Sequence, residues 1–190
     1  MKKIISLLLV VLMFFSLSAC KQDGEKINQD TKTIDSYAIN GEIPEIPVTL
    51  GMTIEKVKQV FPMDTGDADQ DKVILSEVVG ETAVCLVTSN ASFYYEKANQ
   101  DKGVSVIAVT GGSVYGLKLL DVTTKSDITA KLEAEYTERV ATEADQYFLL
   151  GPAQNCNILS ATFDKIRLDF FLVDGYLTAA TITNTEYWTD

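Results

Sequence analysis

Apolar and polar residues follow two periodicities along this chain, first that of a helix and then that of β-strands. Apolar residues recur at helical spacing from Ile54 to Phe61. Thr53 precedes them as an N-cap whose hydroxyl can accept a backbone N–H, and Pro62 would end the helix. Short β-branched and aromatic runs between turn residues then predict strands at 73–75, 83–87, 91–95 and 104–109.

The same order returns in the second half of the chain. Thr124, with Asp127 three residues later, approximates a capping box. Ile128, Leu132 and Tyr136 then follow at i, i+4 and i+8, which predicts one face of a helix. Apolar runs predict further strands at 146–150, 158–163, 166–172 and 177–183, with Asp174-Gly175 as a hairpin turn.

The pattern therefore predicts an α+β fold built from two tandem repeats, at 46–111 and 112–190. Each repeat would be a short helical segment followed by about four antiparallel strands, and together they would form one sheet-based domain. Thr53 and Thr124 lie 71 positions apart, as do Val57 and Ile128, which favours an internal duplication. The alternative is that two α+β stretches share this coarse order by chance.

The first twenty residues have the pattern of an export signal. Lys2 and Lys3 precede an apolar run from 4 to 17, which is short for a bilayer span. Leu17-Ser18-Ala19-Cys20 then resembles a bacterial lipobox. This resemblance implies a signal peptide at 1–19 and an acylated Cys20, for example with palmitate. The alternative is an ordinary secretory signal that happens to have a cysteine here.

An acylated Cys20 would hold the mature chain on the extracytoplasmic face of the cell membrane, or on the outer membrane if the host has one. Several acyl chains on one residue make such an anchor stable. The polar residues that follow predict a flexible tether at 20–45, which ends near two prolines, Pro44 and Pro47.

Charge and composition exclude several classes of function. The chain carries a formal net charge of −11, and removal of Lys2 and Lys3 with the signal leaves 14 basic and 27 acidic residues, or −13. This charge disfavours nucleic acid and favours a cationic partner. The chain has no histidine, which excludes histidine-based catalysis. Cys85 and Cys156 could form a disulfide in an exported protein, or could be two buried thiols.

Acidic residues offer one candidate cation site. Asp67, Asp69 and Asp71 alternate as calcium ligands do, but Lys72 and Val78 stand where an EF-hand needs glycine and glutamate. A solvated acidic loop is the alternative. Nucleophile-elbow, Ser-x-x-Lys and phosphate-loop motifs are absent from the mature sequence, so we expect neither an enzyme nor a bound cofactor.

Paired aromatic residues suggest a binding surface. In an extended strand, Tyr94 and Tyr95 must face opposite sides, and so must Phe170 and Phe171. One face would form the core, and the other could bind a protein or peptide. We take as candidate partner-binding residues Tyr94, Tyr95, Phe171 and Tyr176. The alternative is that another segment covers this second face.

Two families resemble this chain. The segment Leu50-Gly51-Met52-Thr53-Ile54-Glu55-Lys56-Val57 resembles the helix entry of the SmpA/OmlA small-lipoprotein family. The tandem arrangement, in which a helix followed by strands occurs twice, is similar to that of beta-lactamase inhibitor protein (a BLIP-like fold). The second repeat departs from the first pattern, since Asp121-Val122-Thr123-Thr124 replaces Gly-Met-Thr. These resemblances imply membrane-tethered proteins that bind other proteins, but no functional residue carries over.

The sequence thus predicts a membrane-anchored, non-catalytic lipoprotein that binds an envelope protein or peptide. The first alternative is a lipoprotein that binds a cation, with calcium at the acidic loop, or a small molecule. The second alternative is an envelope hydrolase.

Overall fold

A computed structural model describes residues 33–61, 75–148 and 155–187, except for the side chains of 146–148. All of these residues belong to one unit of the chain, 32–190. The predicted acylation site Cys20 and the candidate calcium ligands Asp67, Asp69 and Asp71 lie outside the described residues. Those predictions are therefore untested by the structure.

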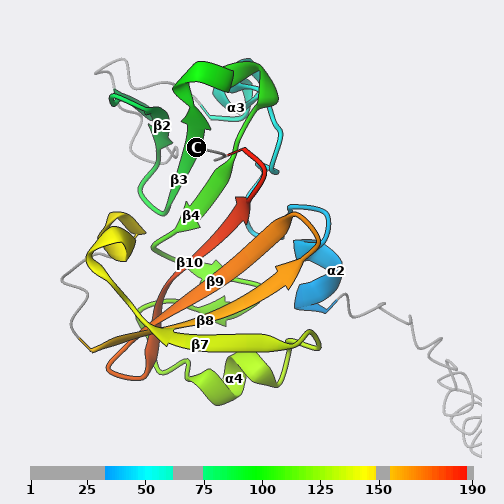
Figure 1. Ribbon diagram of the computed structural model, residues 1–190, viewed down its shortest axis with the longest axis vertical. Helices are drawn as coiled ribbons and strands as arrows, with labels where there is room; N and C mark the ends of the chain where they lie inside the picture. The colour runs from blue at the N-terminus through cyan, green and yellow to red at the C-terminus, as the bar shows by residue number, and fades with distance from the viewer. Residues whose placement is uncertain (1–32, 62–74, 149–154, 188–190) are drawn as a thin grey trace, which may run out of the picture. The chain divides into compact units, whose positions relative to one another are not determined.

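Among the described residues, one large antiparallel sheet dominates the fold, and its strand order is β1-β2-β3-β4-β10-β9-β8-β7 (Figure 1). β4 and β10 lie side by side at its centre, with Val106 opposite Thr183 and Val109 opposite Ala180. The strands are β1 (Ser76–Val79), β2 (Ala83–Val87), β3 (Ala91–Glu96), β4 (Val106–Val109), β7 (Tyr136–Val140), β8 (Cys156–Phe163), β9 (Ile166–Val173) and β10 (Tyr176–Asn184).

Short helices precede each group of four strands, which confirms the predicted α+β class and its sheet-based domain. A two-stranded hairpin stands between the two groups. The helices are α2 (Ile34–Ala38), α3 (Ile54–Val60) and α4 (Lys125–Thr129), the 3-10 helices are η1 (Lys97–Lys102) and η2 (Glu143–Phe148), and the hairpin is β5 (Ser113–Val114) with β6 (Leu117–Lys118).

Both predicted helix caps are present. The Thr53 hydroxyl accepts the backbone N–H of Lys56 at 3.4 Å, at the start of α3. At the start of α4, the Asp127 carboxylate accepts from the backbone N–H of Thr124 at 2.8 Å and from its hydroxyl at 2.7 Å. The backbone N–H of Thr124 lowers the pKa of Asp127, since it stabilises the charged form.

Two of the predicted elements in the second half are wrong. α4 ends at Thr129, and Tyr136 begins β7 opposite Ala161 instead of extending the helix. The predicted strand at 146–150 is helical as far as it is described, because η2 runs to Phe148. The helical spacing of Leu132 and Tyr136 reflects only neighbouring residues in the sequence. In the folded chain, the pairing of β7 with β8 places Tyr136 in a strand instead.

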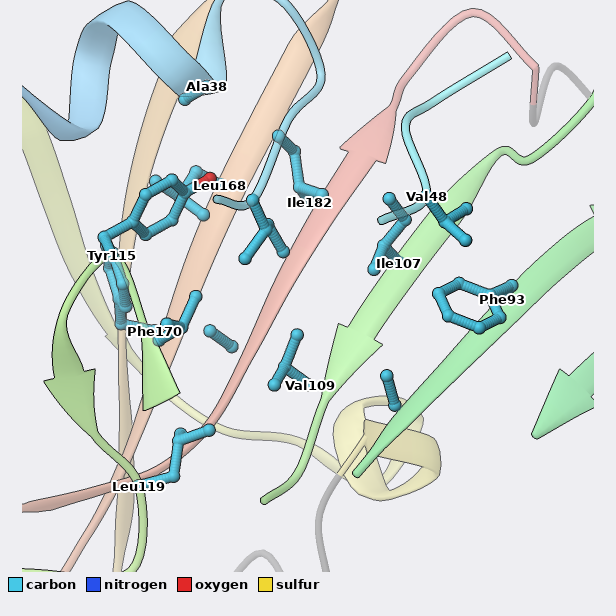
Figure 2. Packing of buried hydrophobic residues seen from close by; sticks show 14 of the residues in the cluster. Ala38, Val48, Phe93, Ile107, Val109, Tyr115, Leu119, Leu168, Phe170 and Ile182 are labelled. Carbon is cyan, nitrogen blue, oxygen red and sulfur yellow. The ribbon is translucent and has the colours of Figure 1, made fainter. Parts of the chain in front are cut away.

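The main core packs against one face of the sheet, here called the inner face. Phe93 of β3 and Phe170 of β9 point into it (Figure 2). Tyr95 of β3 belongs to the same apolar cluster, which includes residues of both halves. The Phe61 ring stacks on Phe93 with centroids 5.8 Å apart, and Tyr115 meets the Phe170 ring at 6.4 Å. The two halves therefore share one core.

Residues 33–50, here called the N-terminal strap, pack over this inner face. Ile34, Ala38 and Ile43 are buried in the main cluster. The Asp35 carboxylate accepts from the backbone N–H groups of Glu133 and Ala134, at 2.7 and 3.0 Å. The predicted flexible tether at 20–45 is therefore wrong from residue 33 onward. Its few apolar residues lack a long period, but Ile34, Ala38, Ile43 and Val48 are buried and Ile39 is exposed.

The opposite face, here called the outer face, is partly covered in the second half. Cys156, Ile158, Phe171 and Ala179 form a second buried apolar cluster there, with Ala141 packed against it. η2 follows β7 and lies against β10, next to this cluster. In the first half, the outer-facing residues of β2 and β3 stay only half-buried.

Candidate partner-binding surface

The four predicted partner-binding residues lie in different environments. Tyr95 is buried in the main core and Phe171 in the second cluster, so assigning either of them to an exposed surface is wrong. For Phe171, the structure agrees with the alternative that other residues cover the second face of the sheet. Tyr94 is half-buried on the outer face of β3, and Tyr176 is 49% exposed at the start of β10. The structure does not bring the four residues together.

Tyr94 lies directly opposite Cys85 of β2 on the outer face. Burial raises the pKa of Tyr94 to about 12, and the neighbouring Cys85 adds to the effect. Burial also raises the pKa of the Cys85 thiol above its usual value. Cys85 is therefore protonated at neutral pH, which makes it a poor nucleophile.

Of the two alternatives for Cys85 and Cys156, the structure has the unpaired thiols, since both cysteines are free. Cys85 lies on β2 and Cys156 on β8, with β3, β4, β10 and β9 between them. Five steps of about 4.8 Å separate the two strands by about 24 Å. The Cα atoms of a disulfide lie within about 7 Å of each other. The two thiols belong to opposite halves of the sheet.

Tyr176 instead lies next to two exposed apolar residues that the sequence analysis did not select. Leu120 is 59% exposed and Val122 is 76% exposed. The backbone holds their segment beside β10, because Leu120 N–H donates to the Leu177 carbonyl at 2.9 Å and Leu177 N–H donates to the Thr123 carbonyl at 2.8 Å. We call Leu120, Val122 and Tyr176 the loop patch.

Leu120 has a strained backbone, with a φ of 58°. A left-handed conformation costs a side chain of this kind about 1 kcal/mol, and such strain is concentrated at functional sites. The exposed Leu120 side chain gains little packing in return. The sequence places Leu120 and Val122 on either side of Asp121, just before the helix cap at Thr124. This position is compatible with a loop, but it does not show that the two apolar side chains are exposed.

Acidic side chains border the loop patch. The Asp121 carboxylate accepts the N–H of Val122 at 2.8 Å and lies 4.0 Å from the Lys118 ammonium. Asp174 is exposed in the turn that precedes Tyr176. Lys118 offsets one of these charges, and the chain as a whole is strongly acidic. The loop patch is therefore apolar at its centre and acidic at its border.

Neither a cluster of metal ligands nor a membrane-spanning helix is found in the described part of the chain. Among residues 33–61, 75–148 and 155–187, no group of three or more acidic or cysteine side chains could hold a metal ion. In the same part of the chain, no helix has both the length and the apolar character needed to cross a membrane. Calcium binding by Asp67, Asp69 and Asp71 stays an alternative, and the absence of enzyme activity stays a prediction.

Comparison with known proteins assigns no function. No protein-family model and no curated protein matches this chain, so its resemblance to the SmpA/OmlA family and to beta-lactamase inhibitor protein stays a prediction. A solved structure that it resembles is a DUF4309 family protein (YjgB) from Bacillus subtilis subsp. subtilis strain 168. The two are 17% identical over 81% of this chain and 95% of that one, with a TM-score of 0.48.

Proposed function

We propose that this chain is a membrane-anchored extracytoplasmic lipoprotein without catalytic activity, which binds a protein or peptide partner through the loop patch. The observation that carries the proposal is the loop patch itself. It exposes three large apolar side chains on neighbouring segments, and one of them has a strained backbone. Exposed apolar patches of this kind are typical of interaction sites.

The acidic border indicates which partner fits the loop patch. Asp121 and Asp174 flank its apolar centre, and the whole chain carries a net charge of −11. A segment with apolar side chains between lysines or arginines would bury its apolar part and pair its cations at the border. Nucleic acid and anionic lipid would be repelled. The proposed partner is therefore a cationic, amphipathic segment of an envelope protein or peptide.

The lipobox at Cys20 supports the proposed location. Thirteen positions separate Cys20 from Thr33, where the described structure begins. Fully extended, this stretch spans at most about 47 Å. The folded domain would therefore stay close to the membrane surface, within reach of proteins embedded in or attached to it.

Site-specific photo-crosslinking in the native host tests the docking surface. A benzoylphenylalanine placed at Val122 or Tyr176 should give the same crosslinked product, since both positions would contact one partner. The matched control is Ile39, which is 59% exposed on the N-terminal strap, and a probe there should not give this product.

A charged substitution completes the test. Val122→Asp should abolish the crosslink from Tyr176 and leave the free energy of unfolding within about 0.5 kcal/mol, because the side chain is exposed. High salt should reduce the crosslink, since charge complementarity is screened. Equal products from Ile39 and Val122, or unchanged crosslinking in Val122→Asp, would refute docking at this patch.

A further inference from the structure

Both arginines of this chain lie on the outer face of the second half, near the same buried carboxylate. The other basic residues are lysines. Arg167 Nε donates to Asp169 Oδ2 at 2.8 Å, and Asp169 is buried on β9. The charge of Asp169 also acts on Arg139 of β7. A buried carboxylate needs such partners, so a structural role for both arginines is expected.

The two arginines differ in how many of their donors are occupied. Arg139 makes a bidentate contact with Asp145, in which each terminal guanidinium nitrogen donates to one carboxylate oxygen at 2.7 Å. Arg167 uses Nε on Asp169, whose other oxygen accepts the Ser160 hydroxyl at 2.5 Å. No acceptor within the described residues meets the terminal nitrogens of Arg167, and its side chain is 45% exposed. Its outer edge is therefore open to solvent.

Hydroxyl groups flank Arg167 on both sides. Thr162 of β8 and Thr183 of β10 are its direct partners across the sheet, so all three side chains project from the outer face. Side chains opposite one another in such pairs lie about 5 Å apart at Cβ. The nearby ammonium of Lys165 is paired with Glu186 at 2.7 Å. The cross-strand row thus consists of the Arg167 guanidinium between the hydroxyl groups of Thr162 and Thr183.

We propose that Arg167, with Thr162 and Thr183, forms a binding site for a carboxylate. The two terminal nitrogens of a guanidinium match the two oxygens of a carboxylate, which allows a bidentate contact. Asp169 orients the guanidinium through Nε before any ligand arrives, so little side-chain freedom is lost on binding. A singly charged, planar carboxylate fits this single cation on an acidic chain better than a phosphate dianion does.

The small number of arginines makes the test direct. An ¹⁵N spectrum of the purified chain should show one Nε–Hε signal for Arg167 and one for Arg139, assigned by the loss of one signal in Arg167→Lys. On titration with sodium acetate, the Arg167 signal should shift and saturate. The Arg139 signal is the internal control and should not move, because Asp145 occupies its fork.

Three further titrations define the ligand class. Sodium chloride at equal ionic strength and inorganic phosphate should each shift Arg167 less than acetate does. N-acetyl-dialanine should bind more tightly than acetate if the natural ligand is a peptide C-terminus, and equally if it is a small acid. Parallel shifts of both arginines, equal shifts with chloride or phosphate, or no shift with acetate would overturn the proposal.

A variant of an exposed residue separates binding from folding. Thr162 is exposed, so Thr162→Val should fold normally. It should weaken acetate binding by about fivefold through the loss of one hydrogen bond. Unchanged affinity in this variant would remove Thr162 from the site and contradict the proposed row of donors.

Discussion

At the scale of single residues, two buried tyrosines show how much a hydrogen-bond partner matters. The Tyr115 hydroxyl donates to the Glu42 carbonyl at 3.0 Å, while the buried Tyr95 hydroxyl has no hydrogen-bond partner among the residues that the structure describes. Burial raises the pKa of both phenols, so both stay protonated at neutral pH. Within the described part of the chain, nothing replaces the hydrogen bonds to water that the Tyr95 hydroxyl loses on folding.

Removing each hydroxyl should thus have opposite effects. We expect Tyr95→Phe to raise the free energy of unfolding by about 1 kcal/mol, because an unsatisfied buried group is removed. We expect Tyr115→Phe to lower it by about 1 kcal/mol, because the Glu42 carbonyl loses its donor. Urea unfolding of both variants measures the difference. Equal destabilisation of the two would mean that the Tyr95 hydroxyl has a partner in solution.

At the scale of elements, α2 depends on tertiary contacts. A helix of five residues is not stable by itself. Ile34 and Ala38 bury one face of α2 in the core, and the Asp35 carboxylate binds two backbone N–H groups of the loop after α4. A second carboxylate of the N-terminal strap, Glu45, accepts from the N–H groups of Tyr115 and Gly116 at 3.0 and 2.5 Å. These contacts attach the strap to the second half.

Two isoleucines of the N-terminal strap allow a matched test of this attachment. Ile34→Ala should lower the free energy of unfolding by about 3 kcal/mol, since it leaves a cavity in the core. Ile39→Ala should change it by less than about 0.5 kcal/mol, because Ile39 is exposed. Thermal and urea unfolding provide the measurement. If Ile34→Ala changed the free energy of unfolding only slightly, residues 33–45 would be a flexible tether after all.

At the scale of the whole molecule, one sheet and one core join two halves of similar order. β4 and β10, the last strands of the two halves, pair along the middle of the sheet. The halves differ on the outer face, where the second half buries a cluster under its own residues and the first half does not. Similar order of elements therefore does not give the two halves the same surface.

The anchor is the prediction that belongs to the whole molecule. Labelled palmitate supplied to the native host should be incorporated into the protein. Cys20→Ser should abolish the label and move the protein from the membrane fraction to the soluble fraction, since the acyl chains would supply the attachment. Cys85→Ser is the control and should keep both label and location. Unlabelled wild-type protein with an uncleaved leader would contradict the proposed location.

The sequence by itself determined the local features of this fold. Thr53 and Thr124 start their helices because capping involves neighbouring residues. Tyr94 and Tyr95 face opposite sides of the sheet, and so do Phe170 and Phe171, because the geometry of an extended strand requires it. The α+β class followed from the same local rules, but one strand of the second half was predicted at 146–150, where η2 lies, instead of at β7.

Only the tertiary structure decided which residues meet across long distances in the chain. It paired β4 with β10, separated the strands of Cys85 and Cys156 by four other strands, and buried Phe171. It also exposed Leu120 beside Tyr176 and left one edge of Arg167 open. Periodicity reports the spacing of apolar residues within one segment. It contains no information on which segment covers which face, because that depends on packing among many distant segments at once.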